Sequence, residues 1–207
     1  MPSFSPPTLK TPMPWKNLRV GLVGGSFNPP HAGHVHISLA AKKTLDLDVI
    51  WWLVTPQNPL KDKLPAPMDQ RIEQCRALTS DHPSIIISDL ERQLGTHITY
   101  DTIIALKKNF PQTDFVWIAG MDNAITFHTW NHWEDLLNEI PVLHANRMPA
   151  TMKMPDCPLR HHAPQTNISV DMQSPKRYDL KPNTSFWLLN SDDIPLSSTQ
   201  IRQQQKQ

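Results

Sequence analysis

Two histidines beside a glycine- and proline-rich turn are the residues of this sequence best suited to chemistry. His31 and His34 end the stretch 24–34, which reads Gly-Gly-Ser-Phe-Asn-Pro-Pro-His-Ala-Gly-His. On a helix that begins near Ala32, side chains three positions apart lie next to each other. The first turn of a helix also has free main-chain N–H groups, which bind anions together with the helix dipole. The spacing therefore predicts an anion site that carries two imidazole groups.

A metal site is the alternative interpretation of these histidines, which His36 would join. Zinc proteases place two histidines four positions apart with a glutamate between them, and no glutamate is present here. Cys75 and Cys157 lie far away and have no C-x-x-C spacing. The sequence therefore predicts no metal site built from side chains, and it favours Cys75 as a small core residue over a nucleophile.

The elements on either side of the turn must hold the histidines in place. Residues 18–23 form an apolar run that is typical of a buried strand. Residues 35–47 have the apolar spacing of a helix and contain no proline. Gly24 and Gly25, between strand and helix, allow the backbone to pass close to a ligand because they carry no Cβ.

The rest of the chain alternates between strands and helices. We predict further strands at 48–54, 84–88, 114–119, 140–145 and 185–189. We predict further helices at 68–80, from about 99 to 109, at 123–127 and from 197 or 198 onward. We expect a loop to begin at 89–91, and a long loop over 145–183 with one short strand near 168–170. This order predicts a single α/β domain with a doubly wound, mostly parallel sheet.

Composition excludes several classes of protein. The chain has 207 residues and a net charge of +1, so it lacks the broad basic surface of a nucleic-acid-binding protein. Two cysteines are too few for a disulfide framework and fit a reducing compartment. We see neither a secretory signal nor an apolar run long enough to span a membrane. We therefore expect a cytoplasmic protein that binds neither nucleic acid nor membranes. A monomer or homodimer is our separate expectation.

Proline marks the regions outside this predicted domain core. Residues 1–16 contain five of the 21 prolines, and we predict a tail that lies on the surface through Trp15. The domain then spans 17–207, with an irregular excursion at about 148–183.

The stretch 24–34 resembles the G-G-x-F-x-P-x-H-x-G-H signature of the nucleotidyltransferases related to class I aminoacyl-tRNA synthetases. It is most similar to the nicotinate-nucleotide adenylyltransferase branch, whose I-S-[SA]-T-x-I-R motif residues 196–202 resemble. In that family the two stretches face each other across the ATP phosphates. The resemblance therefore implies a Rossmann-like fold with an ATP site formed by Gly24, Gly25, Ser26, Phe27, His31, Gly33, His34, Ser197, Ser198, Thr199 and Arg202.

Other matches imply a second site, for a mononucleotide. Thr99 matches the family threonine that helps to hold the pyridine carboxylate, and Trp130 matches the tryptophan that stacks on the pyridine ring. Asp122, in a G-x-D match, suits ribose hydroxyls. The resemblance also assigns Asn28 and Arg147 to this site. The structural alternatives are a helix N-cap for Thr99 or Asp122 and a core residue for Trp130, and we expect Trp133 to be in the core.

Lys61 is a further candidate, because it follows the second predicted strand at the edge of the sheet where ligands bind. The family often has P-H-[KR] where this sequence has Pro59-Leu60-Lys61. A solvent-exposed loop lysine is the alternative interpretation. With His31, His34 and Arg202, Lys61 completes the predicted catalytic set.

The resemblance implies transfer of AMP from ATP to nicotinate mononucleotide, with Mg²⁺ as cofactor. Attack by the acceptor's phosphate on the α-phosphorus requires no covalent enzyme intermediate. Three alternatives remain open at this stage: nicotinamide mononucleotide as acceptor, another phosphate-monoester acceptor of the same superfamily, and a nucleotide-binding module without catalysis.

Overall fold

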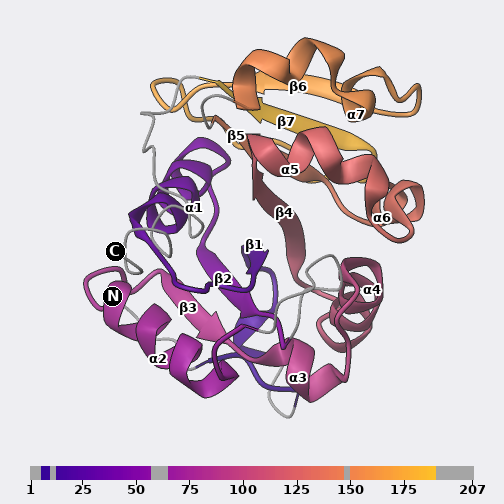
Figure 1. Cartoon of the computed structure of the whole chain (residues 1–207). Coiled ribbons are helices and arrows are strands. Elements are labelled where there is room, and N and C mark those ends of the chain that lie inside the picture. The colour runs from indigo at the N-terminus through magenta and orange to yellow at the C-terminus, as the bar shows by residue number, and fades with distance from the viewer. Residues whose placement is uncertain (1–5, 10–12, 57–64, 147–149, 190–207) are drawn as a thin grey trace.

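The computed structural model describes residues 6–9, 13–56, 65–146 and 150–189. A seven-stranded sheet with the order β3-β2-β1-β4-β5-β7-β6 crosses the molecule, and all of its strand pairs are parallel (Figure 1). The predicted α/β fold class is confirmed. The strands are β1 Arg19–Gly25, β2 Val49–Val54, β3 Ile85–Ser88, β4 Asp114–Gly120, β5 Val142–Ala145, β6 Thr166–Val170 and β7 Thr184–Leu188.

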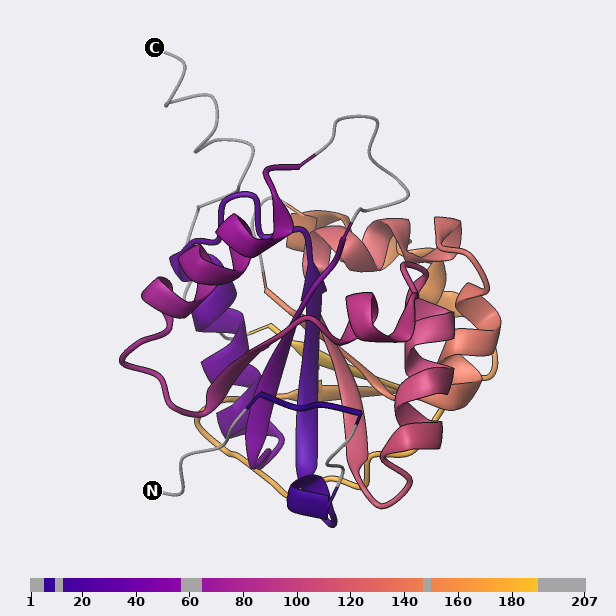
Figure 2. The ribbon, with the colours of Figure 1, turned by 90° about the horizontal axis from the view of Figure 1, so that it is seen from below.

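Helices lie between most of the successive strands and cover both faces of the sheet (Figure 2). The α-helices are α1 Ala32–Thr44, α2 Met68–Leu78, α3 Leu90–Leu94, α4 Thr99–Asn109, α5 Met121–Thr126, α6 Trp133–Glu139 and α7 Pro158–His161. The described residues also form the 3₁₀ turns η1 Met13–Trp15, η2 Phe127–Thr129 and η3 Ala150–Asp156. No helix in the described ranges has both the length and the apolar character that a membrane crossing requires.

Two hydrophobic clusters, one on each face, explain why the central strands of the sheet are mostly apolar. Because successive side chains of a strand point to opposite faces, Trp51 and Trp52 of β2 lie in different clusters. The cluster that contains Trp52 receives α1 and α2, and the cluster that contains Trp51 receives α3 to α7. All six residues of β2 are buried, as expected for a parallel strand covered on both sides.

The carboxyl ends of β1 and β4 separate from each other, and this separation makes room for a site. From β1 the chain first adds β2 and β3 on one side and then crosses to β4 on the other. The β1–β4 pairing stops at Leu22 and Trp117, although the strands continue to Gly25 and Gly120. In open α/β sheets, ligands bind at such a topological switch point.

Several predictions about individual segments were wrong. Residues 90–94 form α3, where we expected a loop, since Leu90 packs into the core. Trp15, through which we expected the tail to lie on the surface, is 2% exposed and lies edge-on to Trp51 at 4.8 Å, so its ring is part of the core. Trp133 is only half-buried and packs against the core from outside.

The excursion after β5 has more regular structure than we expected. It contains η3 and α7, and the buried side chain of Leu159 anchors α7. The short strand that we predicted near 168–170 is present as β6, which pairs with β7 at the end of the sheet. The buried Cys75 confirms the prediction of a core residue, and burial raises the pKa of its thiol to about 12.

Candidate active site

The predicted strand–turn–helix junction is present at the carboxyl end of β1. β1 ends at Gly25, residues 26–31 form the turn, and α1 begins at Ala32 with His31 in extended conformation just before it. The free N–H groups of the first turn of α1 therefore lie at the edge of the sheet where the switch point opens. Ser38, one turn after His34, ties α1 to the sheet by accepting a hydrogen bond from Trp52 Nε1 at 2.8 Å.

The two histidines contact each other. The main-chain N–H of His31 donates a hydrogen bond to Nδ1 of His34 at 3.1 Å, and the two ring centroids are 3.8 Å apart. The ring of His34 also packs against Phe27, with 4.9 Å between centroids. Hydrogen bonding and ring packing thus hold His34 in one orientation at the start of α1.

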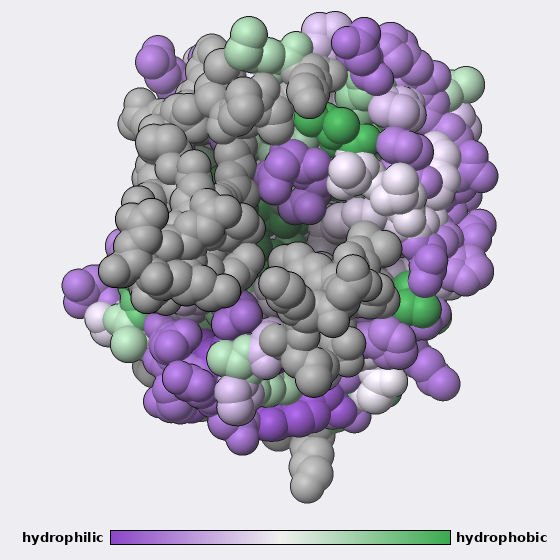
Figure 3. Space-filling model, in the orientation of Figure 1, coloured by the Kyte–Doolittle hydropathy of each residue, from purple (hydrophilic) through white to green (hydrophobic). Residues whose placement is uncertain are grey.

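A cavity of about 250 Å³ opens between the carboxyl ends of β1, β2 and β4. Two of the predicted mononucleotide residues, Thr99 and Trp130, line it together with Gly24 and Gly25. Most of the coloured surface in Figure 3 is hydrophilic, and hydrophobic residues are visible deep in a central hollow. The other residues that line the cavity are Thr55, Glu91, His97, Ile98, Trp117, Ala119, Asn123, Thr126 and Asn131.

Aromatic contacts fix the tryptophan wall of this cavity. Trp130 is half-buried, stacks on Phe127 at 4.8 Å and meets Trp117 edge-on at 6.3 Å. The ring of Trp117 in turn fills the space above Gly24, where a Cβ would clash with it. Gly24 is therefore required by close packing at this point, and Trp130 combines core contacts with a place in the cavity wall.

The histidines border a smaller, neighbouring hollow instead of the main cavity. His31, Gly33 and His34 line it with His36, Ile37, Gly120 and Asn146. Its volume is about 20 Å³. Since Gly120 ends β4 and Gly25 ends β1, both hollows open at the same edge of the sheet.

Three predicted residues lie differently from the others. The side chain of Phe27 is 1% exposed and stacks on Trp52 at 4.7 Å, so only its main chain is available to a nucleotide. Asp122 is exposed in the first turn of α5 and is not among the residues that line the cavity, whereas its neighbour Asn123 is. Ser26 and Asn28 belong to the turn and line neither hollow.

Neither Thr99 nor Asp122 is a helix N-cap, which was the structural alternative for each of them. Ile98 is the N-cap of α4, and Thr99 is its first helical residue. Gly120 is the N-cap of α5. Lys61, Arg147, Ser197, Ser198, Thr199 and Arg202 lie outside the described residues, so their assignments stay predictions.

Sequence reasoning missed Glu91, a buried carboxyl group in the cavity wall. Its side chain is 4% exposed, and the hydroxyl of Thr102 lies 3.4 Å from Oε1. Burial raises the pKa of Glu91 to about 7, while the hydroxyls of Thr55 and Thr102 act in the opposite direction. The available signal was the position of residue 91 just after a strand that ends at the ligand-binding edge.

Comparison with known proteins gives the family. The family model described as cytidylyltransferase-like matches residues 22–204. A protein of Cereibacter sphaeroides named "Probable nicotinate-nucleotide adenylyltransferase" is 40% identical over 184 residues, which cover 88% of this chain and 96% of that protein. A protein of the same name from Methylorubrum extorquens is 40% identical over 188 residues, 89% of this chain and 99% of that protein.

Solved structures support the fold. The Plasmodium falciparum nicotinic acid mononucleotide adenylyltransferase complexed with NaAD aligns with a TM-score of 0.63 at 17% identity, over 90% of this chain and 83% of that one. The same enzyme complexed with APC aligns with a TM-score of 0.62 at 16% identity. Together with the family match, the sequence relatives show that the chain belongs to the nicotinate-nucleotide adenylyltransferases within the cytidylyltransferase-like family.

Proposed function

We propose that this protein transfers AMP from ATP to nicotinate mononucleotide, giving nicotinate adenine dinucleotide and pyrophosphate in NAD biosynthesis. The main support for the proposal is the position of the large cavity relative to the histidine pair. A cavity with an aromatic wall and Thr99 opens at the same edge of the sheet as the histidine pair at the start of α1. Membership of the nicotinate-nucleotide adenylyltransferases supports the same reaction.

The acceptor can attack without help from a base. A phosphate monoester has a second pKa of about 6 and is therefore largely ionised at neutral pH. One of its oxygens forms a bond to the α-phosphorus of ATP, while the bond from that phosphorus to the bridging oxygen breaks. Pyrophosphate leaves with the electron pair of that bond. Because the acceptor attacks ATP directly, no covalent enzyme intermediate forms.

The protein's part is then to position the reactants and to stabilise charge. The start of α1 and the turn before it offer N–H groups to phosphate oxygens. His31 and His34 donate hydrogen bonds to the oxygens on which negative charge develops. Lys61 and Arg202 are predicted to act on the same phosphates.

The mononucleotide fits the main cavity. Trp130 offers an indole face for the pyridine ring, and the first turn of α4, which starts at Thr99, offers N–H groups to the ring's carboxylate. Asn28, Asp122 and Arg147 remain predicted mononucleotide contacts.

Mg²⁺ is the cofactor that we expect, and when bound it neutralises charge on the phosphate oxygens. Within the described ranges, no three His, Cys, Asp or Glu side chains come together as a metal site. We expect the ion to be held mainly by substrate phosphates and water. A cytoplasmic location and a monomeric or homodimeric state are also proposals.

Pyrophosphate release tests the reaction and the acceptor together. Purified protein is supplied with ATP, Mg²⁺ and, in separate reactions, nicotinate mononucleotide, nicotinamide mononucleotide or phosphopantetheine. We expect release with the acid mononucleotide alone. Equal use of acid and amide would overturn the acceptor assignment, and release with none of the three by protein that binds ATP would overturn the reaction.

A further inference from the structure

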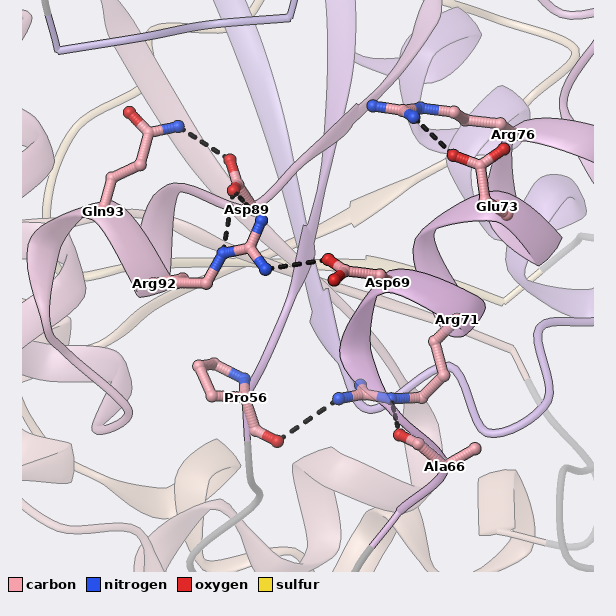
Figure 4. Close-up of polar contacts among 9 residues, drawn as sticks. All are labelled: Pro56, Ala66, Asp69, Arg71, Glu73, Arg76, Asp89, Arg92 and Gln93. Carbon is pink, nitrogen blue, oxygen red and sulfur yellow. Dashed lines mark hydrogen bonds and ion pairs between the residues drawn. The ribbon is translucent and has the colours of Figure 1, made fainter.

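Arg71, in the first turn of α2, makes four hydrogen bonds that no sequence motif predicts. Its side chain is 1% exposed. Nη1 donates to the carbonyl oxygens of Ser26 at 2.6 Å and Thr55 at 2.9 Å. Nη2 donates to the carbonyl of Pro56 at 3.2 Å and Nε to that of Ala66 at 2.7 Å (Figure 4).

These four carbonyl groups come from three separate segments of the chain. Ser26 is the first residue of the phosphate-binding turn after β1, and Thr55 and Pro56 follow the end of β2. The N–H of Thr55 also donates to the carbonyl of Gly25 at 3.0 Å, so the two strand ends are joined directly as well. One guanidinium group thus holds the turn against the carboxyl end of β2.

The same contact determines where the turn directs a donor. In a trans peptide, the C=O and the N–H point in opposite directions. Because the carbonyl of Ser26 points at Arg71, the N–H of Phe27 points away from it. A guanidinium bound to the carbonyl also polarises the peptide and strengthens that N–H as a donor.

The charge of Arg71 has no carboxylate partner within the part of the chain that the structure describes. All of its hydrogen-bond acceptors are neutral carbonyls. Burial lowers the pKa of its guanidinium, and among the described residues Cys75 alone opposes this lowering through its charge. Buried charges are normally paired, because desolvation is costly.

Two other arginines show the contrast. Arg19 also donates to main-chain carbonyls, but the charges of Asp46, Asp48 and Asp114 act on it. Arg92 forms exposed ion pairs with Asp69 and Asp89 (Figure 4).

We propose that Arg71 is a positioning residue of the nucleotide site, which fixes the turn at Ser26 and places behind it a positive charge whose counter-charge is the phosphate chain of the bound nucleotide. This inference rests on the proposed function, because it takes the turn at residues 24–34 to be the phosphate site. It predicts that Arg71 contributes much more to the binding of ligands that carry phosphates than to the binding of ligands that lack them.

Three variants separate charge, hydrogen bonding and general effects of α2. Arg71→Gln removes the charge and most donors, and Arg71→Lys keeps the charge but loses the planar fork. Arg76→Gln is the matched control, since it removes an exposed arginine of the same helix that pairs with Glu73. Circular dichroism and thermal unfolding establish that each variant is folded.

The first readout is binding of ATP and of adenosine, measured by calorimetry without acceptor. We expect Arg71→Gln to weaken ATP binding by about tenfold or more, as for a lost interaction with a charged group, and to change adenosine binding by less than about twofold. Arg76→Gln should bind both like the wild type. Equal losses for ATP and adenosine would reduce Arg71 to a structural residue and overturn the inference.

The second readout is steady-state turnover of Arg71→Lys, which decides the question even if Arg71→Gln does not fold. We expect this variant to keep the KM for ATP within about threefold and to lose about tenfold in kcat, because the charge remains while the turn is less well held. Wild-type kcat in Arg71→Lys would contradict the positioning role. If the wild type binds ATP but forms no dinucleotide, the proposed function fails while the binding comparison still tests Arg71.

Discussion

The Nδ1 atom of His34 accepts a hydrogen bond from the main-chain N–H of His31 at 3.1 Å. An acceptor nitrogen carries no proton, so the proton of the neutral His34 ring is on Nε2. The turn thereby selects the tautomer that presents a donor. This explains how a histidine at this position can stabilise phosphoryl oxygens without first being protonated.

The role of His34 predicts a large effect on turnover. We expect His34→Ala to lower kcat by about 10²- to 10³-fold, as for the loss of one preorganised donor. The measurement is the initial rate of pyrophosphate release at saturating substrates. His128→Ala, at an exposed position of η2, is the control and should keep the wild-type rate. Near-normal turnover in folded His34→Ala would remove His34 from the catalytic set.

Trp130 should act on the mononucleotide and not on ATP. We expect Trp130→Ala to raise the KM for nicotinate mononucleotide by about tenfold, because a ring–ring contact and buried apolar area are lost. The KM for ATP should change little. Trp133→Phe, at a half-buried position that packs against His162 at 4.9 Å, serves as the control. Equal increases in both KM values would indicate a general loss of structure.

Glu91 should make the protein less stable as the pH rises. Its pKa in the fold, about 7, lies above the ordinary value of 4.5. Between these values the unfolded carboxyl is ionised while the folded one keeps its proton, so the free energy of unfolding falls with rising pH. The loss is on the order of 3 kcal/mol by pH 7 and is constant above it.

Denaturant unfolding of Glu91→Gln at pH 4.5 and pH 8 measures this effect. In the variant, the free energy of unfolding should lack the decrease with rising pH that Glu91 causes in the wild type. Glu73→Gln, which alters an exposed carboxylate paired with Arg76, is the control and should retain it. The same pH dependence in Glu91→Gln and in the wild type would show that Glu91 ionises freely in the fold.

His144 of β5 should have the opposite effect on the acid side. It is fully buried between the rings of Phe127 and Trp187, and burial lowers its pKa from 6.5 to about 3. Below pH 6.5 the unfolded histidine takes up a proton that the folded one does not, so stability is lost as the pH falls. The loss is about 2 kcal/mol at pH 5.

The comparison of His144→Leu with the wild type isolates this contribution. Between pH 4.5 and 6.5 the effects of Glu91 and His144 have opposite signs, so the wild-type curve alone does not separate them. We expect the stability of His144→Leu, relative to wild type, to rise by about 2 kcal/mol between pH 7 and pH 5. His128→Leu, which changes an exposed histidine, should follow the wild type.

The strand–turn–helix unit that holds the histidines was predictable because its sequence pattern lies within one short stretch of the chain. The apolar run of β1, the glycine pair and the spacing of His31 and His34 all lie within one strand–turn–helix unit. Patterning also located β2 and β4, which are buried on both faces and are therefore apolar apart from Asp114 at the start of β4. Thr99 and Trp130 were found through resemblance and lie in one cavity.

What the sequence did not reveal depends on contacts between distant segments. Arg71 is one polar residue in a helix until the fold brings the carbonyls of Ser26 and Thr55 to its guanidinium. Glu91 reads as a polar loop residue, and only packing of α3 buries it in the cavity wall. Trp15 follows a proline-rich stretch that suggests a tail, yet its ring packs against Trp51.

The most direct test of the account is a competition in one tube. The wild-type protein receives ATP, Mg²⁺ and equal concentrations of nicotinate and nicotinamide mononucleotide, and chromatography identifies the dinucleotide formed while pyrophosphate is measured in parallel. The account predicts nicotinate adenine dinucleotide and pyrophosphate in equal amounts, with the acid mononucleotide consumed in strong preference to the amide. Formation of neither dinucleotide, or preferential formation of the amide product, would contradict it.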